Sequence, residues 1–171
     1  MYNLINVETQ DRLNMADIIL QFAKGKNILT GNVDVKATAY DIPNSGKRPN
    51  ITSFSRIRTA YVLDPDFMFI ILSIRHRVYS ARNTETNLMD GIMEVLDYNA
   101  YDLKFISEDD ITYNPALGTG QIQIKDIHYI TCEHRTTWQM CQLLDRKYLN
   151  SSRRSIDDFY REAKKNQWIK E

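Results

Sequence analysis

Two segments with strand patterning, separated by a short turn, constrain the fold of this chain most strongly. They cover residues 16–22 and 28–38, and both are rich in β-branched and other apolar side chains. The residues between them include Gly25 and three polar side chains, a composition suited to a tight turn. The sequence therefore predicts an antiparallel β-hairpin in the first quarter of the chain.

The next part of the sequence predicts one helix and one buried strand. Residues 53–63 repeat apolar side chains at helical spacing, and Ser53 is a suitable N-cap. The uninterrupted apolar run at residues 67–74 is typical of a strand buried on both faces in the middle of a sheet. Before the hairpin, residues 1–14 suggest a short helix or an ordered arm.

The second half of the chain changes from strand patterning to helix patterning. Strands are expected at residues 91–96, 101–106 and 121–124. Helical spacing then extends over residues 132–149, and Ser155 is expected to cap a last helix. This order predicts an α/β (α+β) fold, in which a mixed β-sheet core is flanked by helices and two helices end the chain.

Length and composition set limits on the organisation of the protein. The 171 residues suit a single domain, residues 1–171, with its core sheet in residues 15–125 and a helical part in residues 132–171. The net charge of +0 gives no sign of nucleic-acid binding, so a phosphate-binding surface requires local clustering of basic residues. Two cysteines and the lack of a membrane-length apolar run predict a cytoplasmic protein with no membrane partner.

The predicted hairpin carries a candidate catalytic site. Asp34 and Lys36 lie two residues apart in the second strand, so their side chains point to the same face. Asp17 opens the first strand, and hairpin pairing can bring it to that face as well. Two carboxylates and an ammonium in one place can hold a divalent metal ion and a phosphodiester beside a water molecule.

An acid separated from a lysine by one residue is a weak signal, because the chain contains four such pairs. The pairs at residues 145–147 and 162–164 fall in expected helices, where positions i and i+2 do not share a face. Asp102 and Lys104 fall in an expected strand and are the competing candidate, although neither a tight hairpin nor a basic loop accompanies them. A solvent-facing ion pair between Asp34 and Lys36 is the alternative that patterning leaves open.

Basic side chains follow the hairpin closely. Lys47 and Arg48 end the polar loop at residues 40–48, while Arg56 and Arg58 lie outside the apolar stripe of the following helix. We expect these four side chains to line a cleft that binds the DNA backbone. The alternative is a solvated basic face.

The order of these motifs resembles the core of the PD-(D/E)XK nuclease superfamily, in which an acid at the start of one strand precedes an acid-x-lysine on the next. The sequence motifs around the site are similar to those of HincII-type restriction endonucleases. The matching segments are Ala16-Asp17-Ile18-Ile19-Leu20, Asp34-Val35-Lys36, Pro49-Asn50-Ile51, Ser53, Asp66-Phe67 and Gln121-Ile122-Gln123. The resemblance covers roughly residues 15–125.

This resemblance implies a restriction-endonuclease-like fold and a homodimeric, Mg²⁺-dependent endonuclease that cuts both strands of double-stranded DNA at a short palindrome. Asp17, Asp34 and the Val35 carbonyl would be the metal ligands, and Lys36 would position or activate the attacking water.

The resemblance also implies a DNA-reading loop at residues 44–50. It begins at Asn44, includes Lys47 and Arg48, and has Asn50 in the place of a base-contacting asparagine. Two other functions remain open at this point. One is a nuclease of repair, mobile elements or toxins that cuts without a fixed palindrome, and the other is a non-catalytic DNA-binding protein on the same fold.

Overall fold

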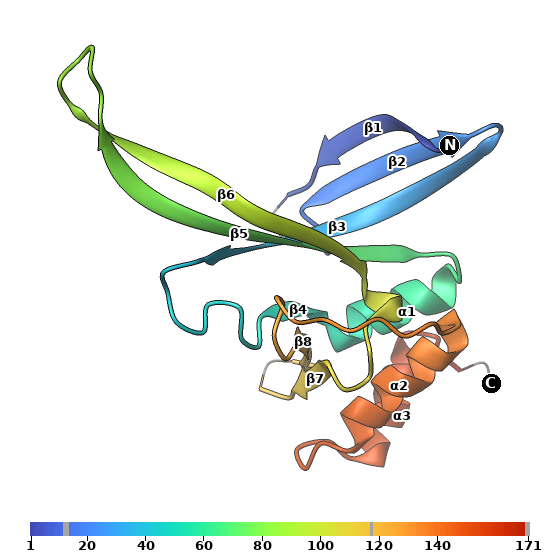
Figure 1. Ribbon diagram of the computed structural model, residues 1–171. Helices are drawn as coiled ribbons and strands as arrows, with labels where there is room; N and C mark the ends of the chain where they lie inside the picture. The colour runs from blue at the N-terminus through green and yellow to red at the C-terminus, as the bar shows by residue number, and fades with distance from the viewer. Residues whose placement is uncertain (12–13, 117, 170–171) are drawn as a thin grey trace.

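The computed structural model describes residues 1–11, 14–116 and 118–169 (Figure 1). The elements follow one another along the chain in this order: β1 (Asn3–Thr9), β2 (Ile18–Lys24), β3 (Asn27–Ala39), β4 (Asn50–Ser53), α1 (Phe54–Leu63), β5 (Met68–Arg82), β6 (Met89–Asp102), the 3-10 helix η1 (Leu103–Phe105), β7 (Ile111–Asn114), β8 (Gln121–Ile124), α2 (Thr137–Leu149) and α3 (Ile156–Lys165).

The strands form two sheets. The large sheet has the order β1-β2-β3-β5-β6, with β3 and β5 parallel and the other neighbours antiparallel. The small sheet has the antiparallel order β4-β8-β7. A parallel pair needs a crossover connection, which β4 and α1 supply between β3 and β5. The predicted mixed sheet with flanking helices and two C-terminal helices is therefore confirmed.

The expected hairpin is formed by β2 and β3. Its strands pair from Ile18↔Val33 to Lys24↔Asn27, so two residues make the turn. Gly25, the first of them, has φ +61°, a conformation that glycine adopts without steric cost. The turn chemistry of the sequence thus sets the register of the strand that carries Asp34 and Lys36.

The hydrophobic core lies between the large sheet and the helices, which gather with the small sheet on one side of it (Figure 1). The predicted stripe of α1, Phe54, Ile57 and Tyr61, is fully or almost fully buried in this core. Ser53 occupies the N-cap position as expected, but its hydroxyl contacts Ser55 and Thr119 rather than a backbone N–H of the helix.

The strand at residues 67–74 was expected to be buried on both faces, and this is wrong for one face. Phe69 and Ile71 of β5 are fully buried under the helices, whereas Ile70 and Leu72 on the other face are only half-buried. Beyond the end of β3, β5 and β6 continue as a two-stranded hairpin away from the body of the molecule (Figure 1). The apolar run therefore predicted the strand correctly, but it did not predict which face of the strand is buried.

Three other local predictions need correction. Residues 3–9 form strand β1, which pairs with β2, instead of a helix or an arm. The two strands expected at residues 91–96 and 101–106 are one strand, β6, followed by η1. Residues 97–99 between them pair with β5 in regular order, and a register shift lies next to them at Leu96. Residues 111–114 form a strand, β7, that the sequence analysis did not assign.

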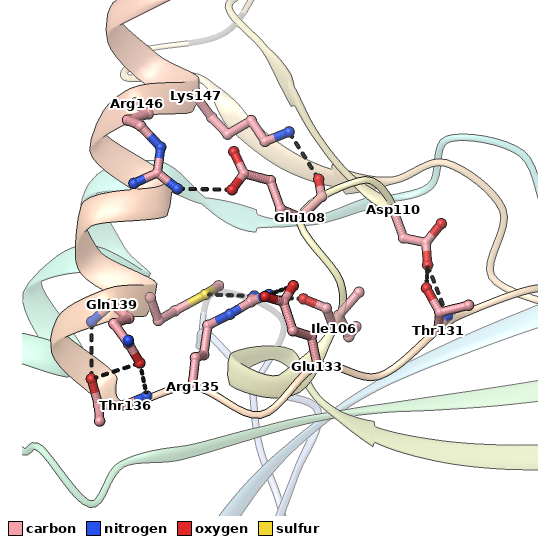
Figure 2. A network of polar contacts seen from close by, with 11 residues as sticks. Ile106, Glu108, Asp110, Thr131, Glu133, Arg135, Thr136, Gln139, Arg146 and Lys147 are labelled. Atoms are coloured by element: carbon pink, nitrogen blue, oxygen red, sulfur yellow. Dashed lines mark hydrogen bonds and ion pairs between the residues drawn. The ribbon is translucent and has the colours of Figure 1, made fainter.

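The helix expected to begin at residue 132 begins at Thr137, where Thr136 and Gln139 form a capping box. The preceding residues are extended because polar contacts hold them to the segment after η1 (Figure 2). Buried Arg135 donates to the Ile106 carbonyl at 2.6 Å, and Thr131 donates to Asp110. No helix in the described part of the chain is long and apolar enough to cross a membrane.

Candidate active site

Asp17 lies immediately before β2 and reaches across to β3. Pairing between β2 and β3 ends at Ile18↔Val33, so the Val35 N–H of β3, which points towards β2, has no backbone partner on that strand. The Asp17 carboxylate takes that place, since its Oδ2 accepts a hydrogen bond from the Val35 N–H at 2.7 Å. The hairpin thus fixes Asp17 beside the two residues that flank Val35.

Asp34 and Lys36 project from the same face of β3, the face that Ile71 and Ser73 share on β5. The Lys36 ammonium lies 3.0 Å from Asp34 Oδ1 and 2.9 Å from Oδ2. The structure therefore brings the three candidate side chains together, Asp17 through the Val35 amide and Lys36 through an ion pair with Asp34.

The Asp34 carboxyl is 6% exposed, and its environment is unusual for a carboxylate. Burial raises its pKa from 3.8 to about 6, the Lys36 ammonium opposes that shift, and the Asp17 charge adds to it. The buried Oδ2 lies 2.9 Å from the Lys36 ammonium, and no donor among the described residues meets it in hydrogen-bond geometry. A buried carboxylate oxygen with unused lone pairs, next to a second carboxylate, is a suitable ligand for a divalent cation.

The raised pKa of Asp34 makes a prediction for the metal-free protein. The folded state holds the proton more tightly than the unfolded state, so this stabilisation is complete below pH 3.8 and is lost as pH rises through about 6. Asp34→Asn cannot ionise, so in EDTA at pH 7.5 it is expected to be more stable than wild type by on the order of 3 kcal/mol. Urea unfolding from pH 4 to 8 measures this difference, which should shrink towards low pH; a difference independent of pH would contradict the placement of Asp34.

Both carboxylates open into a cleft of about 500 Å³. Ser53 and Arg56, at the start of α1, line its other side together with Gln121 of β8. Gln121 was not among the predicted site residues. Its signal in the sequence is the alternation of residues 121–124, which buries Ile122 and turns Gln121 outward.

Of the two arginines of α1 that were expected to line a DNA-binding cleft, only Arg56 does. Arg58 is 5% exposed and forms two hydrogen bonds to Asp145 of α2, at 2.9 and 3.1 Å. Its guanidinium also lies 5.4 Å from the ring centre of Trp168. The expectation for Arg58 is corrected, because two residues of helical rotation turn it away from Arg56 and into the helix interface.

The candidate DNA-reading loop is exposed and has unusual backbone geometry. Asn44 and Arg48 have φ values of +64° and +48°, in the left-handed region. Both side chains are exposed, as is that of Lys47, whose ammonium forms an ion pair with Asp126. Asn50 is also exposed and accepts a hydrogen bond from Gln123 at 2.8 Å.

The loop is held to the chain that follows β8. The Arg48 N–H donates to the Lys125 carbonyl, and the Ile127 N–H donates to the Gly46 carbonyl. Gly46 packs against the His128 ring so closely that a Cβ on it would lie 2.4 Å from a ring carbon. His128 in turn contacts the Thr38 hydroxyl at 3.1 Å, two residues beyond Lys36 on β3. His128 thus contacts both the loop and the strand that carries Asp34 and Lys36.

The competing pair, Asp102 and Lys104, has a different use. Asp102 ends β6 and accepts a hydrogen bond from the Lys104 backbone N–H at 2.9 Å, which caps η1. The Lys104 ammonium lies over the Phe105 ring instead of beside the carboxylate. The geometry of Asp102 is therefore that of a helix cap.

Comparisons with known proteins agree with the resemblance of the motifs. A family model described as type II restriction endonuclease HpaI matches residues 1–167. The type II restriction enzyme HpaI of Haemophilus parainfluenzae is 71% identical over 170 residues, which are 99% of this chain and 67% of the relative's length. The expected relationship to restriction endonucleases is confirmed. The chain belongs to the type II restriction endonuclease HpaI family.

Proposed function

We propose that this chain is a Mg²⁺-dependent restriction endonuclease that hydrolyses phosphodiester bonds of double-stranded DNA at a short palindrome. Membership of a restriction-enzyme family makes it an endodeoxyribonuclease. The observation that supports the metal and the site is the meeting of Asp17, Asp34 and Lys36, with both carboxylates lining the cleft and the Asp34 carboxylate buried beside the Lys36 ammonium.

The proposed metal ligands are the carboxylates of Asp17 and Asp34 and the carbonyl of Val35. All three are oxygen donors, which Mg²⁺ prefers, and so small a set leaves room for water and phosphate. When bound, the ion would neutralise charge on the phosphate and lower the pKa of a nearby water. Asp34 must be ionised to act as a ligand, so acid conditions oppose binding.

Lys36 is proposed to act on the reacting phosphate. Its ammonium is held at Asp34 and is 24% exposed as a side chain, so it can reach a group in the cleft. There it would stabilise the extra negative charge of the transition state and orient the attacking water by hydrogen bonding. The ion pair with Asp34 keeps the ammonium in position before DNA arrives.

DNA binding is proposed to divide between backbone and base contacts. Arg56 lines the cleft beside the two carboxylates and is the candidate for a phosphate near the cut. Lys47 and Arg48 of the exposed loop add positive charge, and such contacts make affinity strongly dependent on salt. Asn44 and Asn50 are the candidates for base contacts.

A homodimer is part of the proposal, because one active site cuts one DNA strand and a palindrome presents two equivalent strands to be cut. Exposed apolar side chains on the edge strand β6, among them Met93, Val95 and Tyr98, offer a surface for a second copy. Light scattering coupled to size-exclusion chromatography would measure the mass directly.

Cleavage of supercoiled plasmid tests the proposed function. With Mg²⁺ the protein should give discrete fragments, and with EDTA it should leave the plasmid intact. A smear would support a nuclease without a fixed palindrome, and DNA binding without cleavage would support a non-catalytic DNA-binding protein; either result would overturn the proposal.

Asn50→Ala tests the role of the loop in base recognition. A well-placed bidentate contact is worth about 1–3 kcal/mol of discrimination, so the preference for the favoured sequence should fall about 5- to 150-fold while affinity for unrelated DNA is kept. Arg56→Ala is the comparison, since loss of a phosphate contact should weaken binding to all duplexes alike. Equal loss on every sequence for Asn50→Ala would remove Asn50 from base recognition.

A further inference from the structure

Gln123 of β8 hydrogen-bonds to two acceptors of the DNA-reading loop. Its side-chain nitrogen, Nε2, donates to the Arg48 carbonyl at 3.2 Å and to Asn50 Oδ1 at 2.8 Å. Gln123 thus ties the exposed end of the loop to a strand of the small sheet.

These two bonds determine how both amides are turned. The nitrogen and oxygen of a side-chain amide have almost the same shape, so only their partners fix which is which. The Arg48 carbonyl is solely an acceptor, so the Gln123 atom that faces it must be Nε2. The same nitrogen faces Asn50, which must therefore present its oxygen to Gln123 and keep Nδ2 free to donate elsewhere.

The backbone supports this arrangement at both ends. Asn50 is the cross-strand partner of Gln123, and the register between β4 and β8 shifts immediately after it. Such irregularities re-aim side chains and are frequent beside active sites. Arg48 has φ +48°, an unfavourable conformation for a long side chain, and its carbonyl is held by Gln123 in that conformation.

Gln123 also relates the loop to the cleft. Residues 121 and 123 alternate with the fully buried Ile122 and Ile124, so Gln121 and Gln123 point to the same side of β8. Gln121 lines the cleft that contains Asp17 and Asp34. Asn50 is therefore held on the same side of the small sheet as the carboxylates.

We infer that Gln123 is a positioning residue that sets the polarity of the Asn50 amide for base recognition. The inference rests on the proposed function. With Oδ1 partly used by Gln123, Asn50 can donate from Nδ2 to the N7 acceptor of a purine and accept with its second lone pair from the adjacent amino group of adenine. A reversed amide would present its donor and acceptor in the opposite order, and adenine would no longer match.

A double-mutant comparison tests this role. Gln123→Glu places a carboxylate, which only accepts, against Asn50 and the Arg48 carbonyl, so the Asn50 amide should reverse. Gln142→Glu on α2, where the side chain is exposed, is the matched control. Wild type first selects its preferred duplex from a randomised pool, and dissociation constants are then measured with Ca²⁺ in place of Mg²⁺ for that duplex and its single-base variants.

Gln123→Glu should reduce discrimination at the base pair affected by Asn50→Ala by at least about fivefold, and any loss of affinity caused by its added negative charge should be the same for all duplexes. Because Gln123 acts through Asn50, adding Gln123→Glu to Asn50→Ala should cause no further loss. Gln142→Glu should behave as wild type. Gln123→Met keeps the length of the side chain without a charge and gives the same comparison if Gln123→Glu does not fold, as judged by thermal melting.

Three results would overturn the inference. Unchanged discrimination in a folded Gln123 variant would show that the amide needs no support. If the double variant lost discrimination by the product of the two single-variant factors, Gln123 would act independently of Asn50. Wild-type binding without any sequence preference would overturn the proposed function as well, whereas the first two results leave that function intact.

Discussion

Asp34→Asn is expected to reduce DNA cleavage at least about 1,000-fold, and Lys36→Ala about 100- to 1,000-fold, while the protein still folds and binds DNA. The carboxylate is the most buried proposed metal ligand, and the ammonium beside it is the group placed to stabilise charge in the transition state. Removing one preorganised electrostatic group of this kind usually lowers the rate constant by a factor of about 10²–10³, and losing a metal ligand adds to that. Single-turnover cleavage of a short duplex at saturating protein measures the effect.

Asp102→Asn provides the matched control for these variants. It alters the competing acid-x-lysine pair, where Asp102 caps η1. Because asparagine caps a helix about as well as aspartate, both the fold and the cleavage rate should be kept. If Asp34→Asn and Lys36→Ala cut at the wild-type rate while Asp102→Asn does not, the active site has been assigned to the wrong pair.

Arg58→Ala is expected to cause the largest loss of stability, about 3 kcal/mol in the free energy of unfolding. Arg58 is 5% exposed, and its two hydrogen bonds to Asp145 join α1 to α2. Truncating it leaves the Asp145 carboxylate without its partner in a partly buried site, and breaking one half of such a pair costs about 3–5 kcal/mol. Urea denaturation and a fall of roughly 10 °C in melting temperature would show the effect.

Arg146→Ala is the control for Arg58→Ala, because it removes the same kind of side chain from the same helix pair. Arg146 bonds Glu108 at 2.8 Å, but both side chains are exposed (Figure 2). Exposed ion pairs contribute about 0–1 kcal/mol, so this variant should stay close to wild type. Equal losses in the two variants would mean that Arg58 has no special structural role.

The hairpin and the arrangement of its acidic and basic side chains could be predicted because they depend on local rules. Gly25 and its polar neighbours specify a tight turn, and the two-residue period of a strand puts Asp34 and Lys36 on one face. The approach of Asp17 follows from the end of β2–β3 pairing, which leaves the Val35 amide to its carboxylate. Each of these features involves residues close in sequence.

What could not be predicted depends on contacts between distant segments. Arg56 and Arg58 are alike in sequence, and only the position of Asp145 on α2 decides which of them is buried. The strand β1 needs β2 as a partner, and nothing within residues 1–14 specifies that pairing. The contact between Gln123 and Asn50 joins residues 73 positions apart, so the Gln-Ile-Gln motif alone indicates a strand but not its partner.

The central claim is that Asp17 and Asp34 share one divalent metal ion, and metal binding tests it most directly. Mn²⁺ titration of the protein–duplex complex, followed by electron paramagnetic resonance and corrected for the duplex alone, should reveal one saturable site per chain in wild type. That site should disappear in both Asp17→Asn and Asp34→Asn. Undiminished Mn²⁺ binding in the two variants would contradict the account, because the ion would then lie elsewhere.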